Sequence, residues 1–402
     1  MTLDATELLI EKLKTTQGDV QAQAALMAEF RLSVYPEPQR RALREALDAA
    51  AVLHWFDSWL LAQVLAIPEI EARGRFEQLQ GLSFIEHYGR PDRGLFNVHE
   101  ATRVGWRRRL AAEDLGRLRE LSDRAADCFA GDQPAAGRIE WIYHLLCADP
   151  DGGAGALESM NRDWVGGARP EDFAALARTL NELETTGLVA GRARAWTLLI
   201  GAWSRALRGE TAQLAEVAAE VLQLAREAAD GPAEGDAQAL LGRVWEAQGQ
   251  LAAAQAAFGE YLTISRRLAE QDPGNAGWQM DLAVAHNRVG NALQAQGQLA
   301  PAQAAFGKYL AISQRLAEQD PSNADWQREL ALACCLLARI KARIGGPETA
   351  LSFYEESARL FALLVERAPG FAQWAAESAA VQSELADYRS SLSRPNQSPP
   401  QA

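Results

Sequence analysis

The chain has 402 residues, which is long enough for two or three domains or for one domain followed by a repeat array. Its 53 acidic residues outnumber its 40 basic ones, and the net charge of -13 argues against a protein whose main function is to coat nucleic acid or anionic lipid. No apolar run approaches the roughly 20 residues of a membrane helix, and the N-terminus lacks the basic start of a signal peptide, so we expect a cytoplasmic protein.

Residues 1–35 predict two short amphipathic helices, which form either an N-terminal cap or the end of a preceding domain. In residues 36–130 the sequence predicts further helices and one β-hairpin. The helical stretches are PQRRALREALDAAAVLHWF, DSWLLAQVL with Asp57 as N-cap, PEIEARGRFEQLQ and, after the hairpin, EATRVGWRRRL. The strands LSFIEHY and LFNVHE flank the turn GRPDRG. The pattern therefore predicts three helices followed by a two-stranded wing.

This order of elements resembles a winged helix. The segments FEQLQGLSFIEHY and LFNVHEATRVGWRRRL are similar to the winged-helix module that follows the nucleotide-binding domain of STAND-type signalling ATPases. The resemblance implies a packing and hinge module in a protein that ends in a repeat array. Because the sequence has no G-x-x-x-x-G-K-[ST] phosphate loop, we expect neither ATP hydrolysis by this chain nor a cofactor.

A winged helix that binds DNA is the alternative for this region. Residues 73–109 carry eight basic and four acidic side chains, a local excess of positive charge. The candidate nucleic-acid contacts are four arginines of the wing and of the helix before it: Arg73, Arg75, Arg90 and Arg93. That helix also carries Glu69, Glu71 and Glu77, whose carboxylates repel phosphate, so a packing role is favoured.

Residues 131–390 predict a helical repeat array. The phrase LAEQDPGNAGWQ returns 48 residues later as LAEQDPSNADWQ, and a third, degenerate copy follows. The Asp-Pro turn is followed in each copy by a tryptophan: Trp278, Trp326 and Trp374. Asn275 or Asn323 is expected to cap the next helix, and Gly297 to end one in the left-handed conformation. Each unit is thus a helical hairpin that buries its apolar face only when copies stack.

The repeated positions resemble the tetratricopeptide repeat (TPR). The first copy has Gly242, Trp245, Gly249, Ala254, Phe258 and Tyr261 at the family's motif positions. The second copy has Gly290, Leu293, Gly297, Ala302, Phe306 and Tyr309. The third departs at its second position and has Ala338, Lys341, Gly345, Ala350, Tyr354 and Ser357. The usual period is about 34 residues, so these helices are longer, as in the long-helix repeats of bacterial signalling proteins.

The fold class expected is therefore mainly all-α, a right-handed α-solenoid of TPR-like hairpins preceded by a winged-helix domain with a small β-hairpin. Weaker helical hairpins precede the clear copies, giving roughly five or six between residues 138 and 390. The tail over 391–402, rich in Pro, Ser and Gln, is expected to be disordered.

The TPR resemblance places partner binding on the concave face, which is lined by the first helix of each hairpin. Its predicted groove residues are Arg243, Glu246, Asn287, Asn291, Gln294, Arg339 and Arg343. Asn291 and Arg339 occupy equivalent places in successive copies and are the preferred pair. The set lacks the Lys and Asn pattern of repeats that bind C-terminal carboxylates, so the expected ligand is an extended peptide or a helix.

Catalytic and metal-binding residues are not predicted. The cysteines Cys128, Cys147, Cys334 and Cys335 lack metal-ligand spacing and are read as reduced thiols. His144 and Cys147, one helical turn apart, are the one candidate for a thiol nucleophile, but no third orienting group accompanies them. Packing is the favoured role for each of the five histidines.

The function expected is that of a non-enzymatic adaptor or sensor that binds a protein or peptide partner. A second hypothesis is the regulatory half of a STAND-like signalling or defence system whose ATPase, protease or other effector is a separate chain. The third is a winged-helix DNA-binding regulator. The partner, the pathway and the oligomeric state do not follow from the sequence.

Overall fold

The computed structural model describes residues 5–131, 134–167 and 170–393. Over these ranges the chain forms nineteen α-helices, one short 3-10 helix and a two-stranded hairpin, which confirms the all-α class. It divides into two compact units. Unit 1 comprises Met1–Asn161 with Ala168–Ser204, and unit 2 comprises Arg162–Gly167 with Arg205–Ala402. The domain boundaries expected at 36, 131 and 391 stay predictions.

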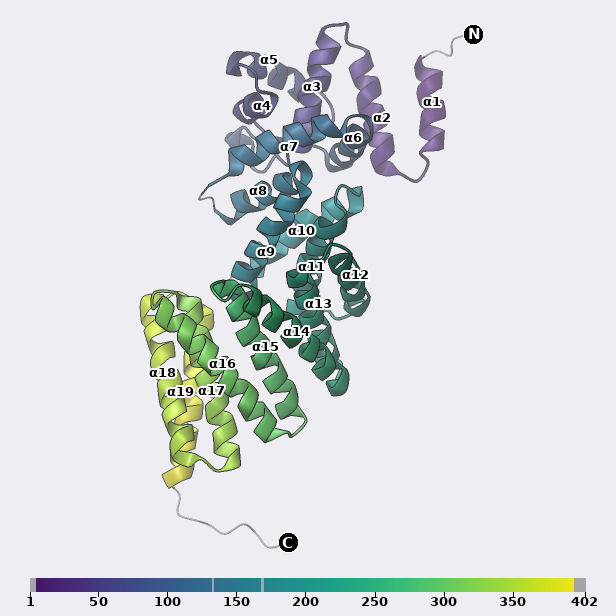
Figure 1. Cartoon of the computed structure of the whole chain (residues 1–402). Helices are drawn as coiled ribbons and strands as arrows, with labels where there is room; N and C mark the ends of the chain where they lie inside the picture. Colours follow the sequence, from purple (N-terminus) through teal and green to yellow (C-terminus); the bar gives the residue numbers. More distant parts are fainter. Residues whose placement is uncertain (1–4, 132–133, 168–169, 394–402) are drawn as a thin grey trace. The chain divides into compact units, whose positions relative to one another are not determined.

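Unit 1 begins with the two predicted short helices and continues through the predicted hairpin region (Figure 1). Its elements are α1 (Ala5–Thr15), α2 (Val20–Ser33), α3 (Gln39–Val52), α4 (Ser58–Leu65), α5 (Glu69–Gln80), β1 (Ile85–His87), η1 (Pro91–Arg93), β2 (Phe96–Val98), α6 (Glu100–Glu113), α7 (Leu115–Phe129), α8 (Ala135–Ala148) and α10 (Pro170–Thr186). Helices α9 (Pro150–Gly167) and α11 (Gly191–Leu207) have residues in both units.

The hairpin of unit 1 is hydrogen-bonded to the segment that connects α3 to α4. Strands β1 and β2 pair antiparallel with Ile85 opposite Val98, and the backbones of Phe56 and Phe96 exchange hydrogen bonds of 2.7 and 2.9 Å. Because Phe56 must be extended to make this bridge, the helix predicted to run through it ends at Val52 instead. Asp57 then caps α4 by accepting from the Leu60 amide at 2.8 Å, as predicted.

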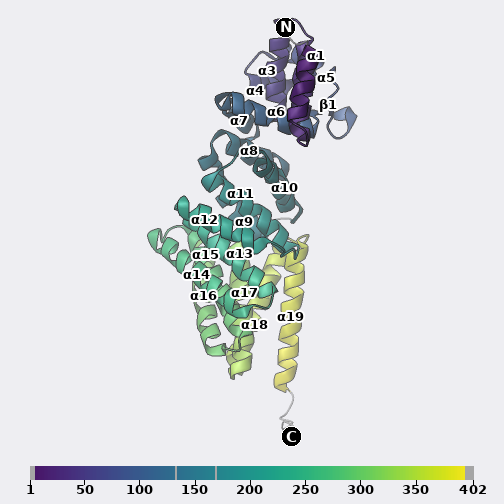
Figure 2. The same ribbon diagram turned by 90° about the vertical axis from the view of Figure 1, so that its right-hand side faces the viewer.

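Unit 2 is a succession of helices, each of which packs against the next from α12 to α19 (Figure 1, Figure 2). They are α12 (Leu214–Glu227), α13 (Gly231–Ala247), α14 (Leu251–Gln271), α15 (Ala276–Ala295), α16 (Leu299–Gln319), α17 (Ala324–Ile344), α18 (Pro347–Arg367) and α19 (Ala372–Ser393). The predicted TPR-like hairpins are confirmed as the pairs α13–α14, α15–α16 and α17–α18. Residues 391–393 of the tail predicted to be disordered are helical and belong to α19. The remaining tail residues, 394–402, lie outside the described residues.

Local signals set the ends of these helices as the sequence predicts. The Asn275 side chain accepts from the Trp278 amide, and the Asn323 side chain accepts from the Trp326 amide, both at 3.1 Å. Gly297 adopts φ +77° just after α15, a conformation that other residues reach only at a cost. The turns within and between the hairpins are therefore encoded by residues at the turns themselves.

The two helices of each clear hairpin meet through a glycine and an aromatic ring. A Cβ atom built on Gly290 of α15 would lie 2.5 Å from the ring of Phe306 on α16, and Gly242 faces Phe258 in the same way. Both rings are almost fully buried. In the third hairpin Ala338 and Tyr354 take these positions. The glycines therefore permit a helix approach that a side chain would block.

The repeated tryptophans lie at the starts of α15, α17 and α19 and are half-buried rather than enclosed. Trp374 packs at 4.7 Å between ring centroids on Phe371 and borders the core formed by α17 and α18. Partial burial reduces the stabilisation expected of each tryptophan below the full transfer value of an aromatic side chain.

Candidate functional site

A hollow of about 450 Å³ lies on the first helices of three successive hairpins in unit 2. Its lining residues are Glu246 of α13, Asn291, Gln294 and Ala295 of α15, and Leu336, Arg339 and Arg343 of α17. Five of these seven belong to the predicted groove set. The structure thus brings together most of the residues that the repeat alignment selected.

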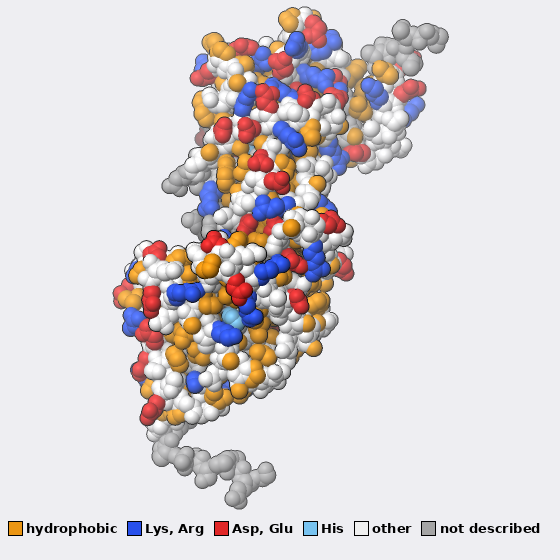
Figure 3. All heavy atoms as spheres, in the orientation of Figure 1, with side chains coloured by type: hydrophobic (Ala, Val, Ile, Leu, Met, Phe, Trp, Pro, Cys, Tyr) orange, Lys and Arg blue, Asp and Glu red, His pale blue; other side chains and the backbone are white. Residues whose placement is uncertain are grey.

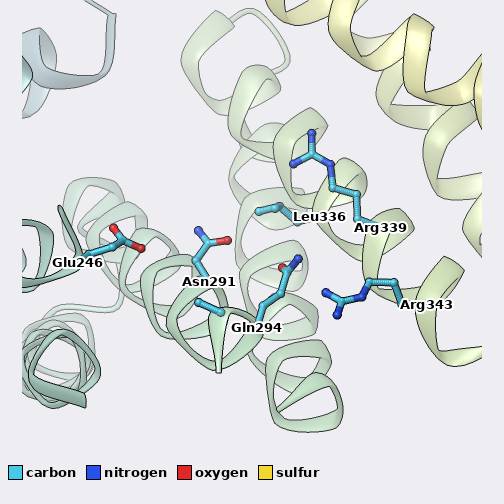
Figure 4. Close-up of a pocket in the computed structure, with 7 residues that line it drawn as sticks. Glu246, Asn291, Gln294, Leu336, Arg339 and Arg343 are labelled. Carbon is cyan, nitrogen blue, oxygen red and sulfur yellow. The ribbon is translucent and has the colours of Figure 1, made fainter. Parts of the chain in front are cut away.

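The repeat period explains why these residues meet. Arg243, Asn291 and Arg339 are successive equivalents at the 48-residue interval, so stacking of the hairpins places them in one row across α13, α15 and α17. Figure 4 shows the amides of Asn291 and Gln294 between Glu246 on one side and the two arginines of α17 on the other. The hollow is therefore a polar surface with charges at its two sides and amides in the middle.

The amides of α15 differ in how they are engaged. Asn291 Nδ2 donates to Asn287 Oδ1 at 2.8 Å, which places Asn287 behind Asn291 rather than in the lining. The side chain of Gln294 makes no hydrogen bond within the residues that the structure describes. Its amide has both a donor and an acceptor group, as a peptide backbone requires of its partner.

Arg339 is held in place by the last helix. Its Nε and Nη2 atoms lie 2.8 and 2.6 Å from the two carboxylate oxygens of Glu384 on α19. Hydrogen bonding to Glu384 raises the pKa of Arg339 despite burial, so the guanidinium is firmly charged. Arg339 therefore fixes α19 as well as lining the hollow, a partner that sequence spacing did not indicate. Its role in binding stays a prediction.

The arginines predicted as nucleic-acid contacts have unequal surroundings. Arg73 pairs with Glu69 at 3.3 Å, and Arg75 pairs with Glu45 at 3.0 Å and Glu71 at 2.7 Å. Arg90 and Arg93, in the turn between the strands, have no ion-pair partner in the described ranges. Much of the local positive excess is thus neutralised within the protein.

The surface of unit 1 agrees with this pairing. On the face shown in Figure 3, basic and acidic side chains are interspersed over unit 1, without a broad stripe of one sign. A phosphate backbone is bound most strongly where cations gather on one face. DNA binding by Arg90 and Arg93 stays an untested alternative.

The surroundings of His144 and Cys147 oppose the thiol-nucleophile hypothesis. Both side chains are buried in α8, and His144 stacks on Phe129 at 5.8 Å between ring centroids. Burial lowers the pKa of His144 to about 3 and raises the pKa of the Cys147 thiol. A reactive cysteine needs the reverse shifts, so packing accounts for this pair.

Unit 1 contains a buried ionic cluster that sequence reasoning missed. We define the ionic cluster as His54, Arg103, Arg107, Glu140, Tyr143 and Glu182. Glu182 of α10 accepts from Nη1 and Nη2 of Arg103 at 2.8 and 2.6 Å. It also accepts from Arg107 and from the Tyr143 hydroxyl, the latter at 2.8 Å. His54 Nδ1 lies 2.7 Å from Glu140 Oε2. The cluster joins the bend after α3 to α6, α8 and α10.

Glu182 and Glu140 of the ionic cluster are ionised at neutral pH. Burial by itself would raise the pKa of Glu182, but the charges of Arg107 and Arg103 lower it to about 2. The pKa of Glu140 is also lowered, because His54 outweighs the effect of burial. No group of three or more His, Cys, Asp or Glu side chains in the described part of the chain is arranged to hold a metal ion. The arrangement is that of a structural ion-pair network.

Acidification is expected to destabilise unit 1 in two stages. The folded pKa of His144 is about 3, well below its ordinary 6.5. Neutral His144 therefore makes its full contribution to the stability of the fold above about pH 6.5, and this contribution is lost as the pH falls toward 3. Glu182, with an ordinary pKa of 4.5 and a folded value of about 2, loses its contribution as pH falls from about 4.5 through 2. Urea unfolding followed by tryptophan fluorescence at a series of pH values measures both stages.

His144→Phe is the control for the first stage, since phenylalanine keeps the stacking on Phe129 and does not titrate. That variant should retain its stability between about pH 6.5 and 4.5, where the unaltered chain loses it. Equal losses in the two proteins over this range would contradict the assignment to His144.

Comparison with known proteins gives structural likeness only. No protein-family model matches the chain, and no curated protein matches it. A STAND protein with a TPR sensor from Pyrococcus horikoshii is similar with a TM-score of 0.41 and 11% identity, covering 94% of this chain. The chain spans 61% of the length of that protein. The apo form of RapI is similar with a TM-score of 0.41 and 10% identity over 72% of each chain. BtubC from P. vanneervenii has a TM-score of 0.35 and 14% identity, covering 70% of this chain and 96% of its own.

None of the helices in the described residues combines the length and the apolar character needed to cross a bilayer.

Proposed function

We propose that this protein is a non-enzymatic interaction scaffold or sensor that binds a protein or peptide partner on the first helices of α13–α14, α15–α16 and α17–α18. The observation that carries the proposal is the polar hollow, in which side chains from three hairpins line one surface. Repeat stacking exposes such a surface because each hairpin uses its other faces to pack on its neighbours.

The chemistry of the hollow suits a peptide. Asn291 and Gln294 present amides that match backbone N–H and C=O groups. Leu336 of α17 adds an apolar surface to the same hollow. Charged side chains at the two sides would select among sequences. An extended segment or an exposed helix of a partner is therefore the expected ligand.

Unit 1 is assigned a packing role within this proposal. The order of α3, α4, α5, β1 and β2 supports a winged-helix module, with the ionic cluster connecting its α3 bend to α6, α8 and α10. Such a module is consistent with a STAND-like regulatory protein in the cytoplasm. That protein would act with a separate ATPase, protease or other effector. Internal pairing of Arg73 and Arg75 weighs against the DNA-binding alternative.

The test is selection of peptides on the full chain, followed by fluorescence polarisation with the best binder. Replacing Asn291 and Gln294 together with alanine is expected to weaken binding by about tenfold or more and to leave the melting temperature unchanged, because neither side chain supports the core. Trp326→Ala should do the opposite, removing about 1–2 kcal/mol of packing and lowering the melting temperature by several degrees.

Two results would contradict the proposal. One is a selection that yields no binder to the folded chain. The other is a binder whose affinity is the same for the Asn291→Ala/Gln294→Ala variant, which would place the site elsewhere.

A further inference from the structure

Three arginines of the inner helices lack an acidic partner. They are Arg243 of α13, Arg288 of α15 and Arg343 of α17, and in the described part of the chain none has a carboxylate oxygen within 4.0 Å. Other arginines of unit 2 are paired with glutamates: Arg226, Arg328, Arg339, Arg359 and Arg389. Arg266, Arg315 and Arg367 of α14, α16 and α18 also lack a carboxylate partner in the described residues. Arg243, Arg288 and Arg343 differ from them in lying on the helices that line the hollow, where a partner's anions would neutralise them.

Two carboxylates in the electrostatic neighbourhood of Arg288 are engaged by other groups. Asp281 lies 3.8 Å from Arg162 Nε, and Glu329 accepts from the Tyr309 hydroxyl at 2.5 Å while pairing with Arg328 at 3.1 Å. The hollow itself contains one carboxylate, that of Glu246, against the guanidiniums of Arg339 and Arg343.

Arg243 and Arg288 also repel each other. Both are half-buried, and burial together with the charge of Arg288 lowers the pKa of Arg243, while the charge of Glu246 on α13 opposes the shift. Two like charges in a partly desolvated site are stabilised when an anion binds between them. Arg343 is exposed at the far side of the hollow, where Figure 4 shows it directed toward the amides of α15.

We propose that the ligand of this surface is an acidic peptide segment, with one Asp or Glu side chain bound by Arg243 and Arg288 and a second bound by Arg343. Its backbone lies across Asn291 and Gln294. Side chains of α13, α15 and α17 all line the hollow, so a segment bound across it passes over three helices between its two acidic contacts.

The inference rests on the proposed function and is tested separately from it. Random peptides of about twelve residues, long enough to span the surface, are displayed on phage and selected on the full chain. The selected sequences are expected to be enriched in Asp and Glu at two separate positions. Selection on an Arg343→Glu variant, checked for an unchanged melting temperature, should remove the enrichment at one of the two positions.

Affinity measurements with the best selected peptide then give the size of the arginine's contribution to binding. Arg343→Gln should weaken the best binder by about tenfold or more, and Arg343→Lys by less, because lysine keeps the charge and loses the paired hydrogen bonds. Arg359→Gln is the matched control, since Arg359 lies on α18 and is paired with Glu356, and it should leave affinity unchanged. Affinity should also fall as salt rises from about 50 to 300 mM.

The outcomes are distinguishable. If peptides are selected without acidic enrichment, or if Arg343→Gln and Arg359→Gln have the same affinity, the acidic ligand is refuted while the interaction scaffold stands. If no peptide is selected, the proposed function itself fails. If single-stranded DNA binds the chain more tightly than the selected peptide and displaces it, the surface is a polyanion site and the peptide assignment is overturned.

Discussion

Replacing Glu182 with glutamine is expected to destabilise unit 1 by about 3–5 kcal/mol, the cost of removing one partner from a buried ion pair. The carboxylate of Glu182 accepts hydrogen bonds from Arg103, Arg107 and the Tyr143 hydroxyl. Arg107 is 0% exposed, so its guanidinium has no water to replace the lost carboxylate. The glutamine keeps the shape of the side chain, removes its charge and replaces one acceptor oxygen with an NH2 donor.

Urea unfolding at neutral pH measures this loss. The control is Glu69→Gln, which removes an exposed carboxylate paired with Arg73 at 3.3 Å and should cost less than about 1 kcal/mol. A triple variant, Arg103→Met, Arg107→Met and Glu182→Leu, should recover much of the stability, because apolar side chains of similar size carry no desolvation penalty. Equal stability of Glu182→Gln and Glu69→Gln would show that the ionic cluster does not hold unit 1 together.

Gly290→Ala is expected to destabilise unit 2 by about 1–3 kcal/mol, although alanine is the better helix former. The new Cβ atom would lie 2.5 Å from the ring of Phe306, which is fully buried and cannot turn aside. The two helices of the α15–α16 hairpin would then have to separate, and the loss of contact would reach the neighbouring hairpins that stack on them.

Gly307→Ala is the matched control for this overpacking. Gly307 lies next to Phe306 in α16, and a Cβ atom there meets nothing within 4 Å. This substitution should stabilise the helix by about 0.5–1 kcal/mol. Thermal unfolding of both variants should therefore shift in opposite directions, and Phe306→Leu combined with Gly290→Ala should recover part of the loss. A stabilised Gly290→Ala protein would show that the close approach is not required.

Features that depend on neighbouring residues were predictable from the sequence. The 48-residue repeat identified the hairpins, and the caps at Asn275 and Asn323 occur where the Asp-Pro turns predicted them. The repeat also explains why five predicted groove residues line one hollow, since equivalent positions in stacked repeats form rows. Periodicity and capping act within one or two helical turns, so they can be read along the chain.

What the sequence alone determined is thus the succession of helices and the face on which polar side chains gather. Tertiary structure decided which of those side chains are engaged. Arg339 is paired with Glu384, 45 residues away, whereas Arg343, one turn later, is unpaired in the described residues. Glu182 meets Arg103 across 79 residues. Such pairs leave no periodic trace, because the contact depends on how distant helices pack and on which charges that packing removes from water.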